Sequence, residues 1–373
     1  MRRTTTIAVL VGLVAGVLGA CGGSHDLDTS TPTTRHGRFP AAVVATTTPS
    51  TTPFGVAVKS TTTTTRKSST NTTSAARAAT TTTTALGRVK PADTPLPVAR
   101  AGVAGVAWQG FVVVAGGAGS GGGFSARVDV YDPKSGQWSR GNNLPVGLRD
   151  AALAVLGDDL WIIGGSAMEN DQPVAQAKTY VFHPGADAWQ DGPALHTART
   201  GVAAATAGNF LVVLGGEQTD GSILDSVEVL PKGGKDWKQT QPMSIPRSFA
   251  SALTMNGRIY AVGGRNPGAP AVNSVESWRS GGGWRSESHL DSERADVSGA
   301  GACVAGGQNS DGVVTTVECF GTGFWVTQGQ MRVPRYGLAA VVLDGWLHLI
   351  GGATAGAAVT NTHEVLDVSA VPS

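Results

Sequence analysis

Residues 210–217 read Phe-Leu-Val-Val-Leu-Gly-Gly-Glu, an apolar run closed by a glycine doublet. The same combination recurs along the chain, with doublets at 116–117, 164–165, 215–216, 263–264, 306–307 and 351–352. The intervals between successive doublets are 48, 51, 48, 43 and 45 residues. Each preceding run has the length and composition of a β-strand. A period of this size, repeated six times, indicates an array of structural repeats.

Other positions keep the same register as the doublets. A tryptophan follows each of the first five doublets, at 138, 189, 237, 284 and 325. Six residues after each tryptophan comes Leu144, Leu195, Met243, Leu290 or Met331. Within the next five residues an arginine follows, at 149, 199, 247, 294 and 335. We interpret the tryptophans as a structural set that packs adjacent units together and most of these arginines as scaffold residues.

This pattern resembles the kelch repeat, whose unit is a four-stranded antiparallel blade of a β-propeller. The resemblance covers residues 86–373. It implies an all-β fold, a six-bladed kelch-type β-propeller with four antiparallel strands in each blade.

The ends of the repeat region predict how the ring closes. The sixth unit ends with a third strand at 361–368, and no tryptophan follows. Near the start, Leu96 occupies the position of the repeated Leu or Met, which places residues 86–92 where an outer strand is expected, with Lys90 at the tryptophan position. We therefore expect an N-terminal strand to close the last blade and remove its open edge.

The fifth unit is shorter and holds two cysteines. Leu290 to Gly306 spans 16 residues, where the equivalent interval elsewhere is 20, so we expect a shortened first hairpin. Cys303 and Cys319 fall on predicted second and third strands on either side of a turn around Asp311 and Gly312. Antiparallel pairing would bring them within disulfide reach. We predict a disulfide; the alternative is two buried free thiols.

The N-terminus has the features of an export signal. Arg2 and Arg3 precede an apolar run at 7–18, which ends in Leu18-Gly19-Ala20-Cys21. This arrangement is typical of a secretory signal peptide, and the run is too short to span a membrane. Its last four residues resemble the bacterial lipoprotein box, which implies a signal peptide at 1–20 and lipidation of Cys21. The alternative is an ordinary signal peptide with an incidental cysteine.

Residues 21–85 are predicted to form a disordered linker. The stretch 22–84 holds 22 threonines in 63 residues. Such a polar segment has too few apolar side chains to bury, so it cannot offset the entropy lost when the chain becomes ordered. It is either an O-glycosylated stalk or a bare spacer. With the lipid, these features predict a protein exported and tethered to the outer side of the membrane.

From residue 86 on there are 20 Lys and Arg against 25 Asp and Glu, and no basic stripe that would suit a nucleic-acid partner.

A binding site in such a propeller is expected on the face formed by the loops after each doublet and before each inner strand. Blades two to five place polar groups there, whereas blades six and one place mostly Ala and Gly. The candidate binding rim consists of Asp150, Ser166, Glu217, Arg265, Asp296, Gln308 and Tyr336. The alternative is a solvated rim in which Glu217 and Arg265 pair across blades.

The sequence offers little support for catalysis. The copper oxidases built on kelch propellers need Tyr, His and Cys ligands, and no pair of histidines here has ligand spacing, so we predict neither metal nor cofactor. The chain also resembles sialic-acid epimerases, six-bladed kelch propellers for which Glu217 would be a general base and Arg265 its electrostatic partner. We expect a binding module for a protein or glycan, with a sugar-modifying enzyme or a structural cell-envelope protein as alternatives.

Overall fold

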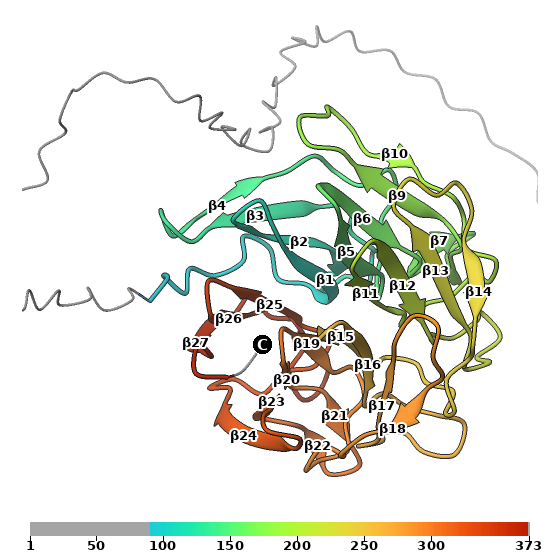
Figure 1. The fold of residues 1–373 in the computed structure, drawn as a ribbon. Helices are drawn as coiled ribbons and strands as arrows, with labels where there is room; N and C mark the ends of the chain where they lie inside the picture. Colours follow the sequence, from blue (N-terminus) through green and yellow to red (C-terminus); the bar gives the residue numbers. More distant parts are fainter. Residues whose placement is uncertain (1–89, 372–373) are drawn as a thin grey trace, which may run out of the picture. The chain divides into compact units, whose positions relative to one another are not determined.

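The structure, a computed structural model, describes residues 90–371. Within this range it is all-β, with six main sheets arranged around a common centre (Figure 1). Each sheet is one blade, and its strands run in sequence order from the centre outward. The six-bladed propeller predicted from the doublets is confirmed. The predicted signal peptide, Cys21 and the linker lie outside the described residues.

The blades follow one another along the chain. The strands of blades one and two are β1 (Ala101–Trp108), β2 (Phe111–Ala118), β3 (Val128–Asp132) and β4 (Gln137–Arg140), then β5 (Ala152–Leu156), β6 (Asp159–Ile163), β9 (Thr179–Phe182) and β10 (Gln190–Asp191). Those of blades three and four are β11 (Ala203–Ala207), β12 (Phe210–Leu214), β13 (Val227–Pro231) and β14 (Lys238–Thr240), then β15 (Ser251–Met255), β16 (Arg258–Val262), β17 (Val275–Trp278) and β18 (Arg285–Ser286). Those of blades five and six are β19 (Ser298–Ala300), β20 (Cys303–Ala305), β23 (Thr316–Phe320) and β24 (Trp325–Gln330), then β25 (Ala339–Leu343), β26 (Trp346–Ile350) and β27 (His363–Asp367).

The inner strands form a closed ring, because each contacts the next and β25 contacts β1. Small residues make this convergence possible. A Cβ atom added to Gly105 on β1 would lie 2.6 Å from the Cβ of Ala339 on β25. The alanines and valines that fill these strands therefore match the space available at the centre.

The doublets interlock neighbouring blades. Gly215 and Gly216 have φ angles of 58° and 91°, which only glycine adopts at low cost. A Cβ atom on Gly215 would lie 2.1 Å from the carbonyl oxygen of Arg247 in the next blade, and the Gly216 N–H donates to that same oxygen at 2.9 Å. The doublet is thus both a strand end and an inter-blade contact.

The tryptophans also join adjacent blades. Trp138, Trp189, Trp237 and Trp284 each donate their indole N–H to a backbone carbonyl two residues before the Leu or Met of the preceding repeat, at 2.8 to 3.0 Å. Trp189, Trp237 and Trp325 are buried, and Trp138 and Trp284 are half-buried. The indole nitrogen of Trp325 has no hydrogen-bond partner among residues 90–371. These side chains form the structural set predicted from their spacing.

Five buried arginines form ion pairs in the interior of the propeller. Each pairs with an acid on the third strand of the next sheet at 2.8 Å or less, in the pairs Arg100–Asp129, Arg199–Glu228, Arg247–Glu276, Arg294–Glu318 and Arg335–Glu364. Four of these guanidinium groups, those of Arg199, Arg247, Arg294 and Arg335, also donate to a carbonyl oxygen of the doublet, as Arg199 does to Gly215 at 2.8 Å. Because a buried charge is tolerated only when it is paired and hydrogen-bonded, these pairs belong to the scaffold. Arg100 and the five acids were not predicted from the sequence.

The closure of the ring differs from the prediction. The sixth sheet has three strands, and residues 90–100 contain no strand. Pro91, Pro95 and Pro97 lie in this segment, and proline has no N–H to donate to a ladder, which accounts for the missing strand. The predicted N-terminal strand is therefore wrong for the described part of the segment; residues 86–89 lie outside the described range.

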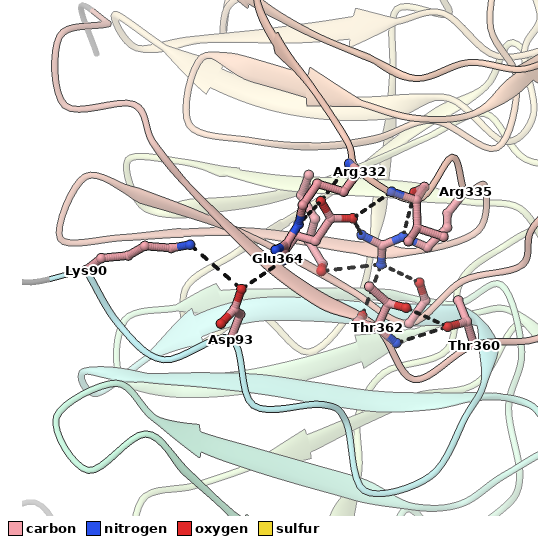
Figure 2. Close-up of polar contacts among 10 residues, drawn as sticks. Lys90, Asp93, Arg332, Arg335, Thr360, Thr362 and Glu364 are labelled. Atoms are coloured by element: carbon pink, nitrogen blue, oxygen red, sulfur yellow. Dashed lines mark hydrogen bonds and ion pairs between the residues drawn. The ribbon is translucent and has the colours of Figure 1, made fainter.

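The N-terminal segment nevertheless makes the contacts of a repeat. The Leu96 N–H donates to the Asn361 carbonyl at 2.8 Å, and the Leu96 side chain is fully buried, as its place in the register predicts. Figure 2 shows Asp93 between Lys90 and Arg332, with the Arg332 bond at 2.8 Å. It also shows Glu364 between Arg332 and Arg335. Side-chain and single backbone contacts thus join the two ends of the ring in place of a ladder.

The fifth blade has the predicted short hairpin and disulfide. Strands β19 and β20 have three residues each. Cys303 and Cys319 are direct partners on β20 and β23, their Cα atoms are 4.0 Å apart, and they form a disulfide. The turn between them carries a small hairpin of β21 (Gln308–Asn309) and β22 (Gly312–Val313).

Candidate functional site

The inner strands begin on one face of the propeller, at a ring of backbone hydrogen bonds. Five of its six members stand two residues after a buried arginine, and the sixth, Asp150, stands two residues after the buried Leu148. All six have positive φ angles of 53° to 65°. Five hydrogen bonds of 2.8 to 3.2 Å connect neighbouring members. We call this set the throat ring; it consists of Gly102, Asp150, Gly201, Phe249, Asp296 and Gly337. Glycine at three positions and side chains at the other three make the ring asymmetric.

One residue earlier, each unit joins this ring to the loop that follows its doublet. Thr200 pairs with Glu217, and Ser248 pairs with Arg265, through isolated antiparallel bridges. Their backbone hydrogen bonds are 2.9 to 3.1 Å long. In the five units with a buried arginine, the residue after it lies beside the residue after the doublet, and in blade two Arg149 lies beside Ser166 in the same way. This explains why the predicted rim residues meet on one face.

Arg149 is the exception among the repeated arginines. In blade three, the carbonyl of the buried Arg199 accepts a hydrogen bond from the doublet glycine Gly165. The equivalent bond, from the doublet glycine Gly117, goes to the carbonyl of Leu148 and not to that of Arg149. Tyr180 stands where the other blades have their acid, opposite Ile162 as Glu228 is opposite Val213. A buried Leu and Tyr thus replace the ion pair in blade two, and the interpretation of Arg149 as a repeat arginine is wrong.

The spacing contains the signal that would have shown this. The buried arginine comes four residues after the Leu or Met in the other five units, as in Leu195 and Arg199. Arg149 comes five residues after Leu144. The one-residue offset places its side chain, 47% exposed, on the loop face.

A cavity of about 570 Å³ near Lys90 and Trp346 lies away from this face; the cavity above the throat ring holds about 530 Å³. Its polar lining includes six of the seven predicted rim residues, Asp150, Glu217, Arg265, Asp296, Gln308 and Tyr336, together with Arg149. The seventh, Ser166, is buried outside the lining and donates to the Thr200 hydroxyl at 2.7 Å. We call this space the mouth cavity.

The mouth cavity has one apolar and one charged side. Blades six and one contribute small or apolar residues, among them Ala101, Ala118, Ala353 and Val359. Blades two to five contribute the charged groups. The polarity therefore changes across the opening, as the composition of the loops predicted.

Glu217 and Arg265 form an ion pair across blades three and four. Ser248 links them, since its hydroxyl donates to Glu217 at 3.1 Å and accepts from the Arg265 Nε at 3.2 Å. The guanidinium lies over the Phe249 ring, 4.7 Å from the centroid, in a cation–π contact. Arg265 is thus held in one place while its side chain stays 41% exposed.

The two aspartates of the throat ring differ in their partners. Asp150 accepts a bond of 2.7 Å from the Arg149 Nε. Asp296 accepts one of 2.7 Å from the neutral amide of Gln308. Burial raises the pKa of Asp150, and it raises that of Asp296 to about 6, with the negative charge of Asp150 adding to the effect.

This arrangement is suited to recognition of a polar ligand. Fixed charges of both signs line a concave, partly desolvated surface, where electrostatic contacts are stronger than in water. Within residues 90–371, no group of three or more His, Cys, Asp and Glu side chains is placed to hold a metal ion. Phe249 and Arg149 were not predicted as rim residues.

Comparison with known proteins agrees with this architecture. The family described as the kelch motif matches residues 99–145 and 246–280, which cover blade one and the first three strands of blade four. This chain is a kelch-repeat six-bladed β-propeller. Among curated proteins, the kelch repeat protein M-T8 of Myxoma virus is 33% identical over 154 residues, which cover 41% of this chain and 29% of the viral protein.

Beta-scruin and the solved structure of YjhT extend the comparison. Beta-scruin of Limulus polyphemus is 24% identical over 244 residues, covering 63% of this chain and 22% of beta-scruin. This chain therefore spans less than a third of the length of either curated relative. The solved structure of YjhT aligns with a TM-score of 0.66 and 14% identity, covering 74% of this chain and 97% of YjhT. At that identity the likeness concerns the fold.

Proposed function

We propose that this kelch propeller is a membrane-tethered, extracytoplasmic interaction module that binds a protein or glycan partner at its mouth cavity. The observation that carries the proposal is the convergence of charged groups from four blades on one concave surface. Kelch propellers are commonly protein-interaction modules, and the similar M-T8 of Myxoma virus is named as a kelch repeat protein.

Charge reversal on the loop face tests this role. The full chain carrying Arg265→Glu should lose binding to its partner on intact cells of the native host, because a carboxylate at position 265 would repel Glu217 and disrupt the wall of the mouth cavity that Glu217, Ser248 and Arg265 form together. Arg279→Glu is the matched control, since Arg279 is an exposed arginine of the same blade outside the lining. Equal binding by both variants would show that the partner uses another surface.

The tether is supported by the N-terminal sequence. Cys21 follows a short apolar run and small residues, and its acylation would anchor the chain when more than one lipid is attached. Within residues 90–371 no helix is long and apolar enough to cross a membrane. Phase partitioning in detergent tests the anchor: the full chain should enter the detergent phase and Cys21→Ser should stay in the aqueous phase. Aqueous partitioning of both would reject the lipid.

A sugar-modifying enzyme is the second candidate, and Asp296 favours it. A carboxyl with a pKa of about 6 is suited to proton transfer near neutral pH. Glu217, the predicted base, is instead engaged by Arg265 and Ser248. NMR of reducing sugars decides: turnover by the wild type that is lost in Glu217→Gln or Asp296→Asn would favour the enzyme over the binding module.

A further inference from the structure

The charges of the mouth cavity do not balance. Its lining contains two arginines and three acids. Arg149 pairs with Asp150 and Arg265 pairs with Glu217. The remaining acid is Asp296, so the ionised cavity has one negative charge in excess.

Asp296 lies at the floor of the cavity without a cation beside it. Its Oδ2 atom accepts from the Gln308 amide, and no described residue donates to its Oδ1. Asp150 stands three places away in the throat ring of six, hence on the opposite side of the opening. Arg149 and Arg265 act on Asp296 more weakly than burial does. Nearby charges therefore leave the ionised carboxylate only partly compensated.

The throat below Asp296 is narrow. A space of about 80 Å³ lies within the ring, and backbone at Gly102, Gly201 and Gly337 forms part of its wall. Above it, the apolar side of the mouth cavity offers Ala101, Ala118 and Val359. A ligand that fits both regions has a small cationic end on a slender aliphatic stem.

We propose that the mouth cavity receives a lysine or arginine side chain of a protein partner, with its cationic group bound between Asp296 and Asp150 and its stem against blades one and six. This inference rests on the proposed function and specifies its partner. Long basic side chains pack their methylene stems on apolar surface while the charged end reaches polar groups. A hydrogen bond between an ammonium or guanidinium group and a carboxylate is among the stronger contacts available. A divalent metal ion would need additional oxygen ligands to complete its shell.

The basic group would supply the missing positive charge. Binding should be strongest where Asp296 is ionised, and it should weaken as pH falls below about 6, the pKa of that carboxyl. Arg149, Asp150, Glu217 and Arg265 face the same space. Of these, Asp150 also has its pKa raised by burial and contributes in the same direction.

Calorimetric titration with short peptides tests the proposal on the full chain. The probe is acetyl-Gly-Gly-Lys-Gly-Gly-amide, and its comparison peptide has norleucine in place of lysine. We expect the lysine peptide to bind and the norleucine peptide to bind at least about tenfold more weakly, the difference of one charge-assisted contact. Asp296→Asn should weaken the lysine peptide by a similar factor. Asparagine tolerates the positive φ of this position, so the fold is expected to persist.

Asp311→Asn is the matched control, because Asp311 is an exposed acid of the same blade outside the cavity lining. Equal affinity for the two peptides, or unchanged lysine binding in Asp296→Asn, would overturn the proposal. Calcium binding in preference to the peptide would overturn it too. If partner binding on cells is lost in Arg265→Glu while no lysine peptide binds, the proposed function stands and this inference fails. If the lysine peptide binds while Arg265→Glu leaves partner binding intact, the cavity binds a basic side chain but the proposed function at the mouth cavity fails.

Discussion

Removal of one buried arginine should destabilise the propeller far more than removal of the exposed Arg149. In Arg199→Leu the fully buried Glu228 would lose the Arg199 contact at 2.7 Å. The carbonyl oxygens of Gly215 and Ser226 would lose their donor as well. Breaking a buried ion pair by deleting one partner costs about 3–5 kcal/mol. We expect the free energy of unfolding to fall by that amount.

Arg149→Leu is the control for this prediction, because its ion pair with Asp150 is 47% exposed on the arginine side. Such a pair is worth about 1 kcal/mol or less. The assay is urea denaturation at neutral pH, followed by tryptophan fluorescence. Equal losses in Arg199→Leu and Arg149→Leu would refute the assignment of Leu148, rather than Arg149, to the buried position.

A double variant tests the mechanism of the loss. Blade two is folded with Leu148 and Tyr180 in place of the pair, so Arg199→Leu combined with Glu228→Tyr removes the uncompensated charge. The double variant should be more stable than Arg199→Leu alone. It should stay below the wild type by about 1–3 kcal/mol, because the His196 N–H loses its acceptor Glu228. In blade two the equivalent residue is Pro145, which has no N–H to satisfy.

The remaining predictions concern pH and the disulfide. The pKa of Asp296 rises from 3.8 to about 6 on folding, so the free energy of unfolding should decrease by about 2–3 kcal/mol as pH rises from 4 to 7. Measured by thermal unfolding, Asp296→Asn should be more stable than the wild type at pH 7 and close to it at pH 4. Burial lowers the pKa of His348 to about 3 and that of His363 to about 4, so their contribution to the free energy of unfolding should be lost as pH falls below 6.5. The variant His348→Phe should flatten that decline. An unchanged pH profile of stability in His348→Phe would contradict the burial of the pair. Replacing both Cys303 and Cys319 by serine should lower the free energy of unfolding by about 2–4 kcal/mol, and two thiols that alkylate without reductant in the native protein would exclude the disulfide.

The scaffold could be predicted because its signals are local and repeated. A glycine doublet, a tryptophan and a Leu or Met each fix one backbone position, and their recurrence in five or six repeats makes the register clear. The disulfide followed from the same register, since Cys303 and Cys319 stand at equal distances from a turn.

The buried acids were harder to predict because a single Glu on a strand has no distinctive neighbours. Their signal is a distance: Glu228, Glu276 and Glu364 each come thirteen residues after the first glycine of their doublet. The last blade has three strands because of the prolines near Leu96. The prediction of a fourth strand used the repeat register alone and did not take these prolines into account. The throat ring could not be predicted from the sequence, because each of its hydrogen bonds joins residues of two different repeats, far apart along the chain.

The candidate site was predicted as a set of residues but not as a geometry. Loop order placed Glu217, Arg265 and Asp296 on one face. Which of them keep a free charge depends on pairing: Arg265 is committed to Glu217, whereas Asp296 has only the neutral Gln308. Burial of the carboxyl, which sets its pKa, is a property of the assembled ring.

Site-specific photocrosslinking tests the central claim, that the partner binds at the mouth cavity. The crosslinker is placed either at Ser120, an exposed residue of the cavity lining, or at Asn256, exposed at the opposite end of β15. In the native cell envelope, Ser120 should give a discrete adduct that disappears with Arg265→Glu, and Asn256 should give none. The same adduct from both positions, or an adduct at Ser120 that survives Arg265→Glu, would contradict the account.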